Sequence, residues 1–98
     1  MDIHINGKHH EAIDDKLTQY THKKLEKLSC YKDIISDICI SYSTDHIKKI
    51  AEAKINITGG QLVSHAECKT MPGAMDLLID KMIRQVIKHK EKHSNIKI

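Results

Sequence analysis

Lysine is the residue whose number and spacing most directly suggest chemistry in this chain. The 98 residues include 15 lysines and one arginine, and the formal net charge is +3. Residues 16–32 carry a net charge of +4 and residues 81–98 carry +5, whereas residues 1–15 and 33–80 each carry −3. Two basic segments separated by an acidic body are typical of a surface that binds a polyanion, provided that the fold brings the segments together.

Within both segments the spacing of the cations matches one side of an α-helix. At about 100° per residue, two arcs result: Lys16, Lys23 and Lys27 with Lys24 at the edge, and Lys81, Arg84, Lys88 and Lys92. A charged arc is more often just the solvated face of an amphipathic helix. Against that explanation, Glu26 and Glu91 are the only acids in the two segments, too few to pair with so many cations.

The composition favours nucleic acid as the polyanion. It also favours contact with the phosphate backbone of the nucleic acid over contact with its bases. Phe and Trp are absent and only three tyrosines occur, so the chain lacks the aromatic sheet surface on which RNA-recognition motifs stack bases. Lysine is a point charge suited to phosphate, whereas bidentate recognition of guanine prefers arginine. Tyr20, which lies within the first arc, and the pair His9-His10 could also touch RNA, although exposed polar filler is the commoner role.

Periodic patterns predict the elements that must position these residues. Alternating apolar and polar residues predict strands over residues 1–6, 37–42, 51–57 and 62–68, with a polar loop at 44–46 and a tight turn at 58–60. Apolar residues at spacings of three and four predict a helix over residues 14–29, capped by Asp14. A second helix is predicted from a cap at Thr70 to about residue 90.

The predicted order is β-α-β-β-β-α in a single α+β domain spanning residues 1–98, with residues 94–98 as a frayed tail. Two helices and a four-stranded sheet bury their apolar surfaces best when the helices pack side by side on one face of the sheet. This arrangement places both basic segments on neighbouring helices. The two arcs and the groove between them should then present about eight cations, spaced roughly 5 to 6 Å apart.

No pattern of catalytic or metal-binding residues accompanies the lysines. His89 and His93 are spaced as two ligands on one helix, but a third ligand is lacking nearby, so solvated histidines are favoured. Cys30, Cys39 and Cys68 are odd in number without C-x-x-C spacing, which argues against disulfides or zinc and favours a reducing cytosol. We expect Cys39 on the open face of the sheet, Cys68 buried, and no metal, cofactor or enzymatic activity.

The sequence also lacks the signs of a membrane or exported protein. Its longest purely apolar run covers only residues 77–79, far short of the roughly 20 residues that span a bilayer. The N-terminus is polar and shows no signal-peptide pattern. A cytoplasmic protein without a membrane partner is therefore expected.

Several segments match a known family. They are IHING at residues 3–7, KLEKL at 24–28, GGQ at 59–61 and, most specific, MDLLIDKMIRQ at 75–85 followed by KHK at 88–90. Through these segments, and over residues 1–93 as a whole, the chain resembles the short ribosome hibernation promoting factors of the ribosome-associated translation inhibitor family.

The resemblance implies a fold similar to double-stranded RNA-binding domains and a place in the small-subunit channel where messenger and transfer RNA would sit. A protein bound there inhibits translation by occupancy, as in ribosome hibernation during stress and stationary phase. By position, the resemblance implies these contacts to ribosomal RNA: Lys24, Lys27, Lys81, Arg84, Lys88 and Lys90. Lys16, Lys23 and Lys92 rest on helical geometry alone.

Two departures from the family pattern refine these expectations. Pro72-Gly73 stands where the family usually has an aromatic residue followed by alanine. The chain stops at Ile98, without the acidic tail of the sister inhibitor or the extra domain of the long form. By resemblance, this favours a protein, monomeric when free, that helps inactive ribosomes pair in concert with a separate ribosome modulation factor.

Two other classes of function stay open. A general binder of double-stranded RNA would have the same basic helices without specificity for ribosomes. A small enzyme using His or Cys is suggested only by the eight histidines.

Overall fold

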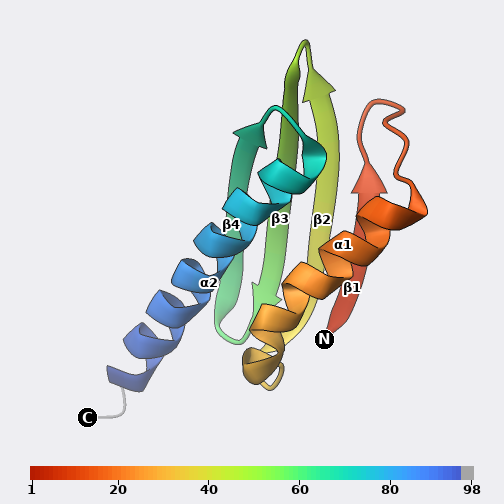
Figure 1. Ribbon diagram of the computed structural model, residues 1–98. Coiled ribbons are helices and arrows are strands. Elements are labelled where there is room, and N and C mark those ends of the chain that lie inside the picture. Colours follow the sequence, from red (N-terminus) through yellow and green to blue (C-terminus); the bar gives the residue numbers. More distant parts are fainter. Residues whose placement is uncertain (96–98) are drawn as a thin grey trace.

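The computed structural model describes residues 1–95, with side chains through Lys92, and folds as a sheet covered by helices (Figure 1). The elements are β1 Asp2–Gly7, α1 Asp15–Leu25, the 3-10 helix η1 Glu26–Tyr31, β2 Ile35–Asp45, β3 Lys48–Ile57, β4 Gly60–Cys68 and α2 Met71–Asn95. The predicted β-α-β-β-β-α order is confirmed.

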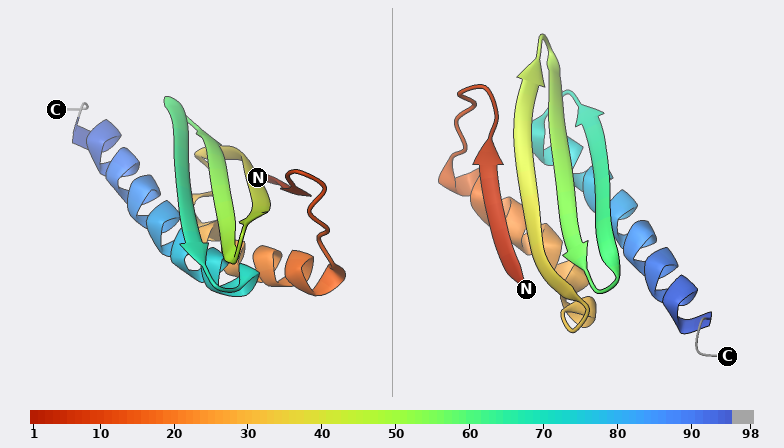
Figure 2. Two further views of the ribbon diagram at one scale, coloured as in Figure 1. Left: turned by 90° about the horizontal axis from the view of Figure 1, so that it is seen from above. Right: turned by 180° about the vertical axis from the view of Figure 1, so that it is seen from behind.

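The four strands form one mixed sheet in the order β1-β2-β3-β4. β1 pairs with β2 in parallel, whereas β2 with β3 and β3 with β4 pair antiparallel. Parallel neighbours need a crossover connection, which α1 supplies between β1 and β2. Both helices lie on the same face of the sheet, α1 toward β1 and α2 toward β4, and within residues 1–95 no helix covers the opposite face (Figure 2).

Both predicted helix caps are present. The Asp14 side chain accepts a hydrogen bond from the backbone N–H of Leu17 at 2.8 Å, and the Thr70 hydroxyl accepts one from Gly73 at 3.1 Å. The first helix, however, is α-helical only to Leu25 and then tightens into η1. Because Leu28 stays buried in the tightened turn, a spacing of three residues could not distinguish the two helix types.

The second helix is longer than predicted. α2 continues to Asn95 instead of ending near residue 90, because the strong helix formers Glu91 and Lys92 follow and no Gly or Pro stops it. Its last turns extend past the end of the sheet (Figure 1), and the protein measures 49 × 21 × 19 Å. Of the predicted frayed tail, residues 94–95 are helical and residues 96–98 lie outside the described residues.

The predicted polar loop at residues 44–46 is wrong. Thr44 and Asp45 continue β2 and pair with Lys49 and Lys48 of β3, which leaves a two-residue turn at residues 46–47. The pairing of β2 with β3 continues beyond the part of the sheet that the helices cover. Its polar residues therefore stay in the strand although they do not alternate with apolar residues. The tight turn predicted at residues 58–60 is present but shorter: it comprises residues 58–59, where Gly59 has a φ of 87°, and Gly60 already pairs with Ile57 as the first residue of β4.

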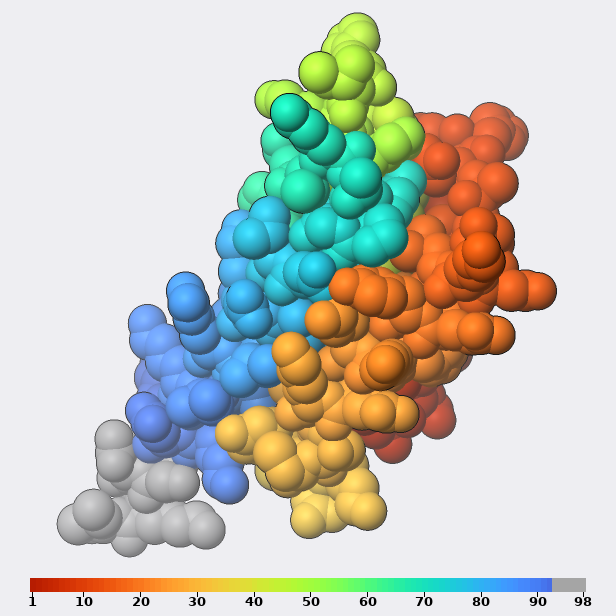
Figure 3. Space-filling model, viewed as in Figure 1, coloured from red at the N-terminus to blue at the C-terminus, as the bar shows by residue number. Residues whose placement is uncertain are grey.

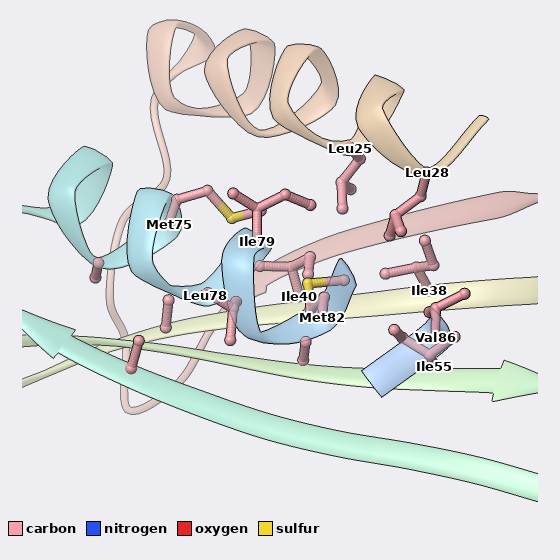
Figure 4. Packing of buried hydrophobic residues seen from close by; sticks show 14 of the residues in the cluster. Leu25, Leu28, Ile38, Ile40, Ile55, Met75, Leu78, Ile79, Met82 and Val86 are labelled. Carbon is pink, nitrogen blue, oxygen red and sulfur yellow. The ribbon is translucent and has the colours of Figure 1, made fainter. Parts of the chain in front are cut away.

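One hydrophobic core fills the space between the sheet and the helices (Figure 4). Its fully buried side chains include Leu25, Leu28, Ile38, Ile40, Ile55, Met75, Leu78, Met82 and Val86. A polar contact joins α1 to β2 within this core: the Thr21 hydroxyl donates to the Leu17 carbonyl at 2.7 Å and accepts from the Tyr42 hydroxyl at 2.6 Å. Burial raises the pKa of Tyr42, so its hydroxyl stays a donor.

The apolar faces of both helices are thus buried in the core of the protein. Among residues 1–95, neither helix is both long and apolar enough to cross a membrane.

Candidate nucleic-acid interface

The first basic arc lies on the solvent side of α1, with Lys27 on the η1 turn that follows it. Lys16, Lys23 and Lys27 are exposed, while Leu17 and Leu25 of the same helix are buried against the sheet. No ion pair involves these three lysines among the side chains that the structure describes. Their ammonium groups are therefore available to an external anion.

Lys24, at the edge of this arc, has an internal partner. Its Nζ lies 3.0 Å from Asp76 Oδ1 of α2, and the same oxygen accepts a hydrogen bond from the Tyr20 hydroxyl at 2.5 Å. Lys24 Nζ also lies 5.3 Å from the centroid of the Tyr20 ring. We call Tyr20, Lys24 and Asp76 the interhelix cluster, because it ties α1 to α2.

The interhelix cluster changes the acid-base properties of its members. The hydrogen bond from Tyr20 lowers the pKa of Asp76, and the nearby Lys24 ammonium lowers it further. The same carboxylate raises the pKa of Tyr20, through their hydrogen bond, and raises the pKa of Lys24. At neutral pH the cluster is therefore an ionised carboxylate between a charged lysine and a neutral tyrosine.

The second basic arc runs along the outer side of α2. Arg84, Lys88 and Lys92 are exposed and have no ion pair within residues 1–92. Lys90 is exposed too, with its Nζ 5.5 Å from the centroid of the Tyr31 ring.

Lys81 belongs to a row of α2 side chains that reach the β4 side of the sheet. Lys81 Nζ donates to the carbonyl of His65 at 2.8 Å, and Gln85 Nε2 donates to that of Val63 at 3.0 Å. One turn further, His89 Nε2 lies 2.8 Å from the carbonyl oxygen of Thr58. We call Lys81, Gln85 and His89 the α2 ladder.

The helices are neighbours as predicted, but the space between them is not a purely cationic groove. We expected the two arcs and the groove between them to present about eight cations as one surface. Asp76 instead occupies the seam between the helices, and Lys81 points away from α1 toward β4. The two arcs therefore flank the seam as separate bands on the helix layer.

Sequence reasoning missed the interhelix cluster and the α2 ladder. Both join residues that are distant in the chain, 56 positions apart for Tyr20 and Asp76. One signal for the cluster was present, since Asp76 lies in the segment that most specifically resembles the family. Nothing in the residue spacing reveals that Lys81 bonds to a strand carbonyl.

The other candidate residues are scattered. No group of three or more His, Cys, Asp or Glu side chains that could hold a metal ion occurs among the described residues. The three cysteines are free thiols. Cys39 lies between the buried Ile38 and Ile40 and so faces the uncovered side of the sheet, while Cys68 is half-buried and packs against the core. The side chain of His93 lies outside the described residues.

The charge on Asp76 gives a prediction for pH dependence. Replacing Asp76 by Asn should lower the free energy of unfolding by less than about 1 kcal/mol at neutral pH, because the cluster is half exposed. Folding lowers the pKa of Asp76 from its ordinary 3.8, so the contribution is fully present above that value and is lost as the pH falls through the folded value. Urea unfolding at about pH 7 and about pH 3 should show this difference shrinking.

The matched control for this prediction is Asp80→Asn. Asp80 lies one turn further along α2, is exposed and has no ion pair within the described residues. Its replacement should leave the free energy of unfolding nearly unchanged at both pH values. A cost of Asp76→Asn that is the same at both would contradict an ionised Asp76 in the cluster.

Fold and charge together define a class: a small α+β domain with a mixed sheet on one side and a layer of two cation-rich helices on the other. Residues 3–94 match the family described as Sigma 54 modulation protein / S30EA ribosomal protein, and the chain belongs to this family. The family resemblance seen in the sequence is thereby confirmed.

Individual relatives and solved structures agree with this assignment. The ribosome hibernation promoting factor of Azotobacter vinelandii is 36% identical over 92 residues, which cover 94% of this chain and 85% of the relative. A ribosomal subunit interface protein from Coxiella burnetii has a TM-score of 0.87 at 32% identity, covering 93% of this chain and 99% of that one. The N-terminal domain of Protein Y from Thermus thermophilus has a TM-score of 0.82 at 27% identity, with 91% and 99% covered.

Proposed function

We propose that this protein is a non-enzymatic ribosome hibernation factor that binds small-subunit ribosomal RNA in the decoding channel and blocks the sites of messenger and transfer RNA. The family and the names of its relatives support the ribosome-associated role. The observation that carries the RNA contact is a set of exposed cations without an ion partner among the described side chains: Lys16, Lys23, Lys27, Arg84, Lys88 and Lys92.

The helices make these cations an effective binder of phosphate. Side chains one turn apart are roughly 5 to 6 Å from each other, a spacing at which several can meet successive phosphates. Each neutralised phosphate releases condensed counterions, and this release drives association. Because the cations stand on packed helices, little ordering of the backbone is needed on binding.

Lys24, Lys81 and Lys90 play a secondary part in this proposal. Each already contacts a group within the protein: Asp76, the carbonyl of His65 and the ring of Tyr31. They add positive potential near the RNA, but a direct phosphate contact by Lys24 or Lys81 requires giving up an internal bond.

In this proposal, inhibition of translation requires only that the protein occupies the decoding channel. A rigid body of 49 × 21 × 19 Å excludes other ligands from any channel in which it is bound. We propose further that the protein is monomeric when free, acts in the cytoplasm and favours pairing of inactive ribosomes together with a separate ribosome modulation factor. The resemblance to short family members supports this part.

Sedimentation with purified small subunits over a salt series tests the proposal. If about six phosphate contacts form, the logarithm of the binding constant should fall with the logarithm of salt concentration with a slope of about −4 to −5. A slope near zero would contradict binding through the two arcs. Competition with free duplex RNA distinguishes the proposed factor from a general double-stranded RNA binder. Excess duplex displaces a general binder from subunits but does not displace a ribosome-specific factor.

A further inference from the structure

A hollow of about 640 Å³ lies between the start of α1 and the start of α2. Figure 3 shows these two segments meeting on the helix face of the protein. The hollow has the size of sites that bind small ligands or parts of larger ones. Its apolar lining includes Ile13, Leu17, Met71 and Pro72.

The ring of Tyr20 forms one wall of this hollow. Lys24 approaches the ring at 5.3 Å and lines a smaller neighbouring hollow of about 360 Å³, but it does not line the larger one. Tyr20 thus borders both hollows, and the larger one is free of the Lys24 ammonium. The bond between the Tyr20 hydroxyl and Asp76 fixes the orientation of the ring.

Charged side chains also line the hollow. Lys16 and Lys49 line it together with Glu11 and Asp14. Both carboxylates are engaged: Asp14 accepts from the Leu17 N–H, and Glu11 accepts from the Thr44 hydroxyl at 2.5 Å. Lys16, one turn before Tyr20, has no ion pair within residues 1–92. An apolar space with a fixed aromatic wall and a free cation complements a flat base followed by a phosphate.

We propose that this hollow takes one unstacked base of the RNA that the basic arcs bind, with Tyr20 as the stacking surface and Lys16 beside the adjoining phosphate. The inference rests on the proposed function and adds to it a contact with a base. The helix layer can thereby offer one stacking position, although the sheet lacks an aromatic platform.

Variants at Tyr20 separate stacking from the contact with Asp76. Tyr20→Leu removes the ring, and its affinity for small subunits should fall by about 5- to 150-fold, the range for loss of one base stacked on an aromatic ring. Tyr20→Phe keeps the ring while losing the hydroxyl, and its affinity should stay within about 3-fold of the unmodified protein. The salt slope should not change in either variant, because no cation is removed.

Tyr31→Leu is the matched control. Tyr31 is half-buried and also has a lysine near its ring, but it does not line the hollow. Its replacement should leave the affinity for subunits unchanged. Thermal unfolding of each variant identifies any affinity loss that comes from unfolding.

A second variant fills the hollow without touching Tyr20. Ala12 is exposed, precedes the cap of α1 and lines the hollow, so Ala12→Trp should occupy the space while leaving the fold and the cations intact. Its affinity should fall as much as that of Tyr20→Leu. A benzophenone group placed at position 15, which is exposed beside the hollow but does not line it, should crosslink to RNA in the complex, and crosslinks to ribosomal protein alone would overturn the inference.

The outcomes distinguish this inference from the proposed function. If the unmodified protein does not bind subunits, the proposed function fails and the base contact fails with it. If it binds with the expected salt slope, but folded Tyr20→Leu and Ala12→Trp bind equally well, only the base contact is wrong. Loss of affinity in both variants, with Tyr31→Leu unaffected, supports the base contact.

Discussion

The double variant Arg84→Glu with Lys88→Glu is expected to lose binding to small ribosomal subunits by at least about 100-fold at moderate salt. Both side chains are exposed on α2 and have no ion pair among the described residues, so no internal contact is lost. The variant removes two phosphate contacts and places two carboxylates in a dense phosphate field. Its thermal unfolding should match that of the unmodified protein, because such surface changes rarely exceed about 0.5 kcal/mol.

A charge-matched control separates a local contact from a general loss of attraction. Lys54→Glu with Lys69→Glu changes the net charge by the same amount, and both lysines are exposed outside the two arcs. This variant should bind with an affinity within about 10-fold of the unmodified protein and retain its salt slope. Equal losses in the two double variants would show that α2 makes no specific contact.

The second large effect concerns the core beneath α1. Leu25→Ala should lower the free energy of unfolding by about 2 to 5 kcal/mol, because Leu25 is fully buried and its truncation leaves a cavity. Urea or thermal unfolding measures the loss, which corresponds to a fall of at least about 8 °C in melting temperature. Since Leu25 anchors the helix that carries Lys16 and Lys23 and leads into η1 with Lys27, binding to subunits should weaken at temperatures where the variant begins to unfold.

Leu77→Ala provides the comparison for the same chemical change. Leu77 of α2 is 48% exposed, so its truncation should cost less than about 1 kcal/mol. Similar losses in the two variants would mean that α1 is not held to the sheet through Leu25.

Local periodicity was enough to predict the order of elements, both caps and the exposed side of each helix. The 3.6-residue repeat of a helix that packs on a sheet places its apolar residues on the buried side and its charged residues on the exposed side. In α1 these are Leu17 and Leu25 on the buried side and Lys16 and Lys23 on the exposed side. The change to a 3-10 turn after Leu25 could not be predicted, because it keeps the same residues buried.

Contacts between distant elements could not be predicted either. The seam between the helices was expected to be cationic, and Asp76 occupies it because its position on α2 faces Tyr20 and Lys24. The bond from Lys81 to the His65 carbonyl likewise depends on how closely α2 approaches β4. Such pairings are set by tertiary packing, on which a repeat within one helix carries no information.

The α2 ladder has a consequence for self-association of the protein. β4 is an outer strand of the sheet, and an outer strand with open carbonyls invites a strand from another molecule to add to it. Lys81 and Gln85 occupy two such carbonyls, so at these positions an incoming strand would have to displace a hydrogen bond that the protein already makes. The helix that carries the second basic arc therefore also hinders the addition of a second strand along β4.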